Sequence, residues 1–188
     1  MEIKTEKSFL SREKFPNQKL LENCIIYVKD KLEERPKIKV FGKECRQNRN
    51  VGFFSKDVER YSYSNSYMVA QQLGEYLSEL LKKVNELTEN NFNGILVNHY
   101  CDGNQYIGAH SDDEKEIGIN GVISISYGSE RKFRVRNKTT KKIFKDINLN
   151  SGDMVHMGGN FQKEFLHEIP IQRKIKEERY SFTFRYHL

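Results

Sequence analysis

The chain has 188 residues, a net charge of +6 and a sequence pI of about 9.1. Hydrophobic residues make up 37% of it and charged residues 31%, which is typical of a soluble globular protein, and the length predicts one domain over residues 1–188. No apolar run approaches the ~20 residues that a membrane helix needs, so we expect no membrane span. The charged N-terminus has no apolar h-region, so we expect no secretory signal.

The basic charge and the cysteines limit the partner and the compartment. A net positive charge attracts polyanions such as nucleic acids through Coulomb attraction and counterion release, although a merely lysine-rich surface has the same charge. Cys24, Cys45 and Cys101 form an odd set without a close pair. They predict free thiols and an intracellular location, in the cytoplasm or nucleus. Nothing in the sequence argues against a monomer.

Two amphipathic helices are predicted in the N-terminal half, over residues 17–34 and 66–87, and residues 90–93 end the second. Apolar residues recur at helical spacing in both segments. In the first helix they are Leu20, Leu21, Cys24, Ile25, Val28 and Leu32. In the second they are Val69, Leu73, Tyr76, Leu77, Leu80, Leu81 and Val84.

From residue 94 onward the pattern changes to short apolar or alternating runs separated by turn residues. Eight such runs predict a β-sandwich or barrel, and two helices packed against it give an α+β, mainly β, fold. Short strands near residues 37–41 and 61–63 would extend the sheets. The eight runs are GILVNHY, QYIGAH, GVISISYG, KFRVR, KKIFKDI, DMVHMG, FLHEIP and RYSFTFRYH.

A His-x-Asp pair, His110 and Asp112, lies at the end of one predicted strand, and His167 lies in another. Residues two apart on a strand point to the same side, so an imidazole and a carboxylate reach one metal ion. Two histidines and one carboxylate form a facial triad that leaves open positions on Fe(II). The pair alone also fits a structural His–Asp hydrogen bond. His99, His156 and His187 are interpreted as ordinary histidines.

Two arginines, Arg179 and Arg185, are six residues apart in RYSFTFR. The even spacing places both guanidinium groups on one face of a strand. Burying them there is costly without anionic partners, and a dicarboxylate such as 2-oxoglutarate supplies two carboxylates. Two surface arginines on an edge strand are the alternative.

Four segments, taken together, resemble the AlkB family of Fe(II)- and 2-oxoglutarate-dependent dioxygenases. They are NHYCDGNQYIGAHSDDE, GVISISYGSERKFRVR, SGDMVHMGGNFQKEFLHEIP and RYSFTFR. The resemblance covers residues 95–186 and extends loosely upstream through NRNVGFFSKDVERYSYS. The order of the motifs also matches: Asn-x-Tyr, Asp-Gly, His-x-Asp, a distal His, then Arg-x5-Arg.

The resemblance implies a double-stranded β-helix (jelly-roll) core over residues 94–188, with residues 1–93 supplying two supporting helices and base-recognition segments. It implies oxidative removal of alkyl groups from bases such as 1-methyladenine and 3-methylcytosine in DNA or RNA. The reaction uses Fe(II), 2-oxoglutarate and O2, releases formaldehyde, succinate and CO2, and is stimulated by ascorbate. Fe(II) would be held by His110, Asp112 and His167, and 2-oxoglutarate by Asn98, Tyr100, Arg179, Ser181 and Arg185.

The resemblance also implies contacts to the substrate. Of the acidic pair after the metal motif, the first residue would approach the polar edge of the base. Two tyrosines would line the base pocket, and a basic loop would bind phosphates. Core aromatics and a solvated loop are the alternatives for the last two. These residues are Asp113 and Glu114, Tyr61 and Tyr63, and Arg173, Lys174 and Lys176, with Lys138, Lys141 and Lys142 as a second basic tip.

Two departures from the family pattern and two alternative functions remain. Ser181 stands where relatives often have Asn, and Asn48-Arg49 where they usually have Pro-Arg. The same chemistry on RNA methyl marks, tRNA or protein is one alternative. A non-catalytic nucleic-acid-binding jelly roll is the other, although a pure binder gains nothing from the complete set of metal and arginine residues.

Overall fold

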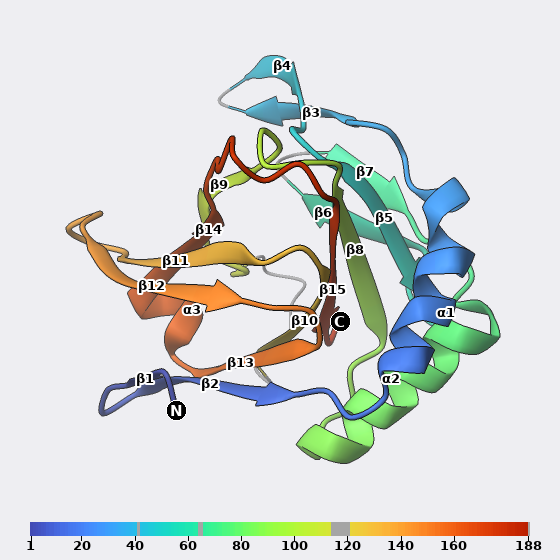
Figure 1. Cartoon of the computed structure of the whole chain (residues 1–188), viewed down its shortest axis with the longest axis horizontal. Coiled ribbons are helices and arrows are strands. Elements are labelled where there is room, and N and C mark those ends of the chain that lie inside the picture. The colour runs from blue at the N-terminus through green and yellow to red at the C-terminus, as the bar shows by residue number, and fades with distance from the viewer. Residues whose placement is uncertain (41, 64–65, 114–120, 188) are drawn as a thin grey trace.

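The computed structural model describes residues 1–40, 42–63, 66–113 and 121–187. Two β-sheets face each other, and two helices cover the outer face of the larger sheet (Figure 1). The mainly β fold with two supporting helices, expected from the sequence, is confirmed.

The larger sheet has seven strands, and every neighbouring pair in it is antiparallel. In spatial order the strands are β1 (Ile3–Lys4), β2 (Ser8–Lys14), β13 (Asp153–Gly159), β10 (Val122–Gly128), β15 (Arg179–Arg185), β8 (Gly94–Tyr100) and β5 (Asn50–Ser55).

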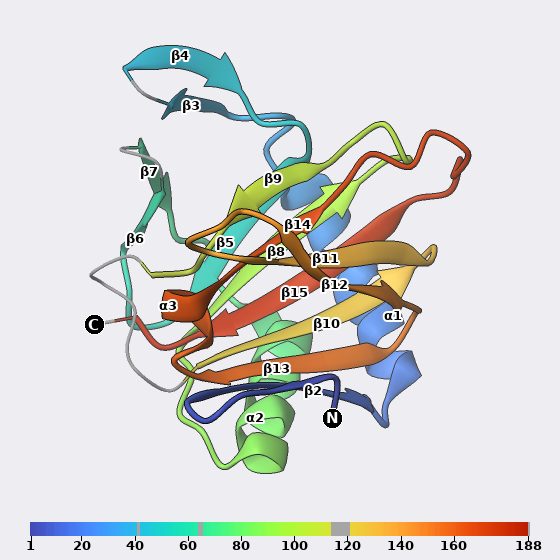
Figure 2. The same cartoon turned by 90° about the vertical axis from the view of Figure 1, so that its left-hand side faces the viewer.

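The smaller sheet has four strands, and two separate hairpins lie beyond the sheets (Figure 2). The smaller sheet follows the order β12 (Ile143–Leu149), β11 (Arg131–Asn137), β14 (Phe165–Ile169) and β9 (Ile107–His110). The hairpins are β3 (Lys37–Val40) with β4 (Lys43–Arg46), and β6 (Arg60–Tyr63) with β7 (Ser66–Val69).

The strands from β8 to β15 form the jelly roll. β8, β10, β13 and β15 lie in the larger sheet, while β9, β11, β12 and β14 lie in the smaller one. All eight runs identified in the sequence after residue 94 form strands, so the jelly-roll prediction is confirmed. The N-terminal half adds β1, β2 and β5 to the larger sheet, and these strands were not predicted.

Strand β15 shows how the larger sheet separates a polar face from an apolar one. Successive side chains on a strand point to opposite faces. Tyr180, Phe182 and Phe184 belong to the apolar core beneath the helices. Their alternating neighbours Arg179, Ser181, Thr183 and Arg185 line a cavity between the two sheets. One seven-residue strand therefore supplies both the packing under the helices and a polar wall of the cavity.

The helices pack through one apolar face each. They are α1 (Gln18–Val28), which continues into a 3₁₀ turn (Lys29–Lys31), α2 (Gly74–Thr88) and the short α3 (Phe161–Glu164). Asn17 caps α1 by accepting a hydrogen bond from Leu20 N at 3.0 Å. Among the described helices, none is long and apolar enough to cross a membrane.

The expected start of the second helix at residue 66 is wrong. Residues 66–69 pair with β6 instead, and Gln71 forms a bridge to Phe54 of β5. Gly74 has φ of +62°, and a Cβ there would lie 2.6 Å from the Tyr27 ring. A glycine in this conformation separates the strand from the helix, so the helix begins only at Gly74.

Truncation of Leu80 tests the packing of α2. The Leu80 side chain is fully buried between the helices and the larger sheet. We expect Leu80→Ala to lower the free energy of unfolding by about 2–5 kcal/mol, because it removes apolar contacts and leaves a cavity. Urea denaturation of the metal-free protein measures the change. Lys82→Ala, on the exposed face of the same helix, should stay within about 0.5 kcal/mol of wild type; an equal loss in both variants would contradict this packing.

Candidate active site

His110, Asp112 and His167 meet between the two sheets. His110 is the last residue of β9 and pairs in register with His167 on β14. His110 Nε2 lies 3.7 Å from Asp112 Oδ1, and His167 Nε2 lies 3.6 Å from Asp112 Oδ2. One potential ligand atom from each residue lies within 4.8 Å of the other two. The arrangement is that of a two-histidine, one-carboxylate metal site.

The protonation states suit a metal ion. Burial favours the neutral imidazole and, with His110 beside it, lowers the pKa of His167 to about 3. Burial works to raise the pKa of Asp112, but the neighbouring Arg185 guanidinium, together with the two histidines, outweighs it and holds the pKa at about 2. The Asp112 Oδ2 atom is buried without a hydrogen-bond partner among the described residues. Neutral imidazoles around an ionised, unsatisfied carboxylate oxygen fit a divalent cation.

The two arginines of β15 lie at opposite ends of the cavity wall. Arg185 Nη2 donates a short hydrogen bond to Asp112 Oδ1, so Arg185 is at the metal end. Arg179 Nη2 donates to Ser126 Oγ at 2.8 Å, whereas its Nε and Nη1 atoms have no acceptor within the described part of the chain. Burial lowers the pKa of Arg179 to about 10. A buried cation with two unused donors fits an anionic ligand.

The remaining predicted cosubstrate residues line the same cavity. In the β8–β15 register, Tyr100 pairs with Arg179 and Asn98 with Ser181. The cavity has a volume of about 40 Å³. Its apolar lining consists of Leu96, Ile107, Phe133, Met157 and Ile169.

Arg49 is a cavity residue that the sequence analysis did not identify as functional. Its Nε atom donates to Asn98 Oδ1 at 2.6 Å, and only 4% of the residue is exposed. The sequence signal was an arginine directly before the apolar strand β5, in the Asn48-Arg49 pair that was noted only because Asn48 replaces the usual proline.

The structure describes only some of the residues that were predicted to contact the base. Asp113 is exposed on the segment that follows β9, and its Oδ2 atom lies 2.6 Å from Lys138 Nζ. Glu114 lies outside the described residues. Tyr61 and Tyr63 are on β6, but their side chains fall outside the described part of the structure.

The predicted phosphate-contacting residues lie on the loop between β14 and β15. Their side chains, those of Arg173, Lys174 and Lys176, are exposed. Gln172 N donates to Gly103 O at 2.8 Å, and Gly103 N donates to Ile175 O at 3.0 Å. The basic loop is therefore fixed to the β8–β9 loop beside it (Figure 2), at the end of β15 that carries Arg179.

Buried Arg131 fixes the same two loops and was also missed. It donates to the main-chain oxygens of Asp102 at 3.0 Å, Gln105 at 2.8 Å and Pro170 at 2.9 Å. Its guanidinium lies 5.5 Å from the centre of the Tyr100 ring. Arg131 therefore joins both loops to the cavity wall.

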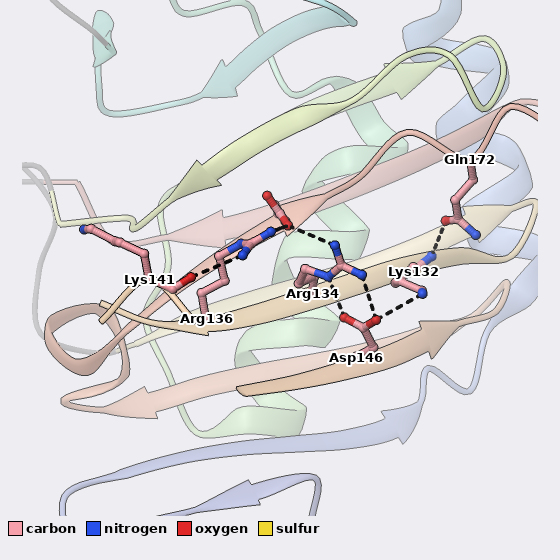
Figure 3. A network of polar contacts seen from close by, with 7 residues as sticks. Lys132, Arg134, Arg136, Lys141, Asp146 and Gln172 are labelled. Carbon is pink, nitrogen blue, oxygen red and sulfur yellow. Dashed lines mark hydrogen bonds and ion pairs between the residues drawn. The ribbon is translucent and has the colours of Figure 1, made fainter. Parts of the chain in front are cut away.

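The outer face of the smaller sheet carries a network of ion pairs (Figure 3). Lys132 and Arg134 contact Asp146 at 3.0 and 2.8 Å, and Arg136 contacts Glu168 at 2.8 Å. The acidic partners offset much of the positive charge of β11. Lys138 was grouped in the sequence with Lys141 and Lys142 as a second basic tip, but its ammonium contacts the segment that carries Asp112.

A family model described as the 2OG-Fe(II) oxygenase superfamily matches residues 8–185. The chain belongs to this superfamily. Its members are dioxygenases that use Fe(II), 2-oxoglutarate and O2. The His–Asp–His group of this chain is arranged so that it could hold a metal ion.

Curated relatives place the oxygenase close to AlkB. It is 27% identical over 157 residues to "DNA oxidative demethylase ALKBH2" of Bos taurus, covering 79% of the chain and 56% of the relative. The protein of the same name from Arabidopsis thaliana is 29% identical over 178 residues, covering 80% and 57%. "Alpha-ketoglutarate-dependent dioxygenase alkB homolog 3" of Rattus norvegicus is 33% identical over 115 residues, covering 56% and 39%. The oxygenase thus spans little more than half the length of these ALKBH2 relatives.

A solved structure, OsALKBH1, has the same fold, with a TM-score of 0.67, 16% sequence identity and full coverage of both chains. The AlkB-like assignment and the jelly-roll fold predicted from the sequence are confirmed.

Proposed function

We propose that this oxygenase removes alkyl groups from N-alkylated bases, such as 1-methyladenine and 3-methylcytosine, in DNA or RNA. The observation that carries the proposal is the meeting of His110, Asp112 and His167 with Arg179 and Arg185 in one cavity. The relatives named as DNA oxidative demethylases supply the substrate class. The net charge of +6 favours a polyanionic substrate.

In the proposed mechanism the residues of the chain bind, orient and shield the reactants. His110, Asp112 and His167 would hold Fe(II), while Arg179, Arg185, Asn98, Tyr100 and Ser181 would bind 2-oxoglutarate. When bound, Fe(II) with 2-oxoglutarate and O2 would supply the oxidising power for hydroxylation of the N-methyl group. The products would be succinate, CO2 and, from the hydroxymethyl base, formaldehyde. The apolar side chains on part of the cavity wall would limit the access of water.

Substrate recognition is proposed from the residues around the cavity. Asp113 and Glu114 would approach the polar edge of a cationic base, where a nearby carboxylate is attractive in a partly desolvated pocket. Tyr61 and Tyr63 would stack on the flipped base, and Arg173, Lys174 and Lys176 would contact phosphates. We further propose an intracellular monomer that ascorbate stimulates.

Two isomeric bases test the substrate proposal. Oligonucleotides carrying cationic 1-methyladenine or neutral N6-methyladenine, as DNA and as RNA, are incubated with Fe(II) and 2-oxoglutarate and followed by mass spectrometry. We expect the cationic isomer to lose its methyl group faster, because Asp113 and Glu114 would place carboxylates next to the base. Faster loss from the neutral isomer would indicate RNA methyl marks instead, and succinate formation with both isomers intact would indicate tRNA or protein substrates.

A further inference from the structure

The ammonium group of Lys138 makes three hydrogen bonds around Asp112, the carboxylate of the proposed metal site. Lys138 Nζ donates to Ser111 Oγ at 2.7 Å, to Asp113 Oδ2 at 2.6 Å and to the main-chain oxygen of Gln162 at 2.9 Å. An ammonium has three donor hydrogens, so these three acceptors satisfy it. Ser111 and Asp113 are the two neighbours of Asp112. Lys138 therefore grips the chain on both sides of the metal carboxylate.

The turn that carries Lys138 is held by hydrogen bonds of its own. Asn137 Oδ1 accepts hydrogen bonds from Thr139 N at 3.0 Å and Thr140 N at 2.9 Å. Lys138 N donates to Glu164 O at 2.9 Å, which fixes the lysine backbone against α3. A side chain that starts from a fixed backbone loses less freedom when its end is bound. The lysine is thus a firm support for the segment it contacts.

The contacted segment needs such a support. The β9–β14 pairing reaches His110, and residues 111–113 lie beyond it without strand structure. Gln162 supplies one further contact, because its Oε1 atom accepts from Asp112 N at 2.9 Å. Lys138 also binds the main chain of Gln162, so the two supports are joined to each other.

We propose that Lys138 is a positioning residue for the metal site, which holds residues 111–113 so that Asp112 faces His110 and His167. Replacing a residue that orients a metal ligand typically weakens metal binding, even though that residue does not touch the metal. The inference concerns the iron site of the superfamily reaction and is independent of which alkylated substrate the oxygenase uses.

The test compares three variants of the full chain. Lys138→Met removes the ammonium and keeps the apolar stem, and Lys138→Arg restores charge and donors. Lys141→Met is the matched control, because Lys141 lies on the same turn with its side chain exposed and directed away from the ion-pair network (Figure 3). Mn(II) is titrated into each metal-free protein, without substrate, and its affinity is measured by calorimetry. Thermal unfolding of the same metal-free variants is also recorded.

We expect Lys138→Met to weaken Mn(II) binding by about 10- to 100-fold. Lys138→Arg should recover most of the affinity, and Lys141→Met should bind as wild type does. In turnover assays of Lys138→Met, the Fe(II) concentration that gives half of the maximal activity should rise. The KM for 2-oxoglutarate at saturating Fe(II) should stay unchanged. A folded Lys138→Met protein with wild-type Mn(II) affinity would overturn the proposal. If Lys138→Met does not fold, Lys138→Gln is used, and undiminished affinity in that variant overturns it equally.

Discussion

Asp112→Ala should abolish turnover while leaving the protein able to bind nucleic acid. Asp112 supplies the carboxylate between the two imidazoles, so its loss should remove the metal ion that we propose this site holds. A metal ion that stabilises the transition state contributes several kcal/mol, so its loss should lower the rate on the order of 10³-fold or more. Succinate formation and Mn(II) calorimetry measure the two effects.

Asp146→Ala is the control for the loss of a paired carboxylate. Asp146 is bound to Arg134 and Lys132 on the outer face of the smaller sheet, away from the cavity (Figure 3). This variant should keep wild-type metal affinity and turnover. Because Asp112→Ala leaves Arg185 without its buried partner carboxylate, some loss of stability is also expected. Undiminished turnover in a folded Asp112→Ala protein would exclude this metal site.

Arg179→Met should raise KM for 2-oxoglutarate by roughly 100-fold or more. Arg179 is buried with two donors that have no acceptor in the described residues, and a carboxylate can accept from both. Each hydrogen bond to a charged group contributes about 1.5–3 kcal/mol, so the loss of two accounts for this change. The measurement is the dependence of succinate formation on 2-oxoglutarate concentration at saturating Fe(II).

The comparison for Arg179 is Arg134→Met, which removes an arginine from the outer face of the smaller sheet instead of the cavity. Its KM for 2-oxoglutarate should equal that of wild type. Equal KM values in Arg179→Met and wild type would mean that Arg179 does not bind the cosubstrate. A matching rise in Arg134→Met would point to a general loss of structure.

The two faces of β15 could be predicted from the sequence because they follow from a local pattern. Alternation along RYSFTFR separates arginines from aromatics, and a strand converts that alternation into two faces. The eight strands after residue 94 were predictable for the same reason, since each run is bounded by turn residues. The family resemblance then placed these strands in a jelly roll.

The strands that were missed depend on partners far away in the chain. β2 pairs with β13, where Leu10 lies opposite Met157, and no local pattern in SFLSREK indicates this. β5 acquires its place by pairing with β8. Strand pairing over such separations is decided by tertiary packing, which a local periodicity does not record.

The supporting residues of the site were missed for a similar reason. Arg49 reaches Asn98, and Lys138 reaches Ser111 and Asp113, across 49 and 25–27 positions of sequence. A basic residue in a turn looks the same in the sequence whether its side chain is exposed to solvent or hydrogen-bonded to a distant segment. Only the fold shows which carboxylate or amide it meets.

One experiment tests the central claim, that this chain is an oxygenase that demethylates bases, most directly. The protein is loaded with Fe(II) without oxygen, then exposed to O2, 2-oxoglutarate and an oligonucleotide with one 1-methyladenine. Mass spectrometry quantifies succinate and the demethylated oligonucleotide in the same sample. We predict that both products form together and that both disappear when Fe(II) or 2-oxoglutarate is omitted, or when Asp112 is replaced by alanine. An intact methylated oligonucleotide without succinate, in an iron-loaded wild-type protein, would contradict the account.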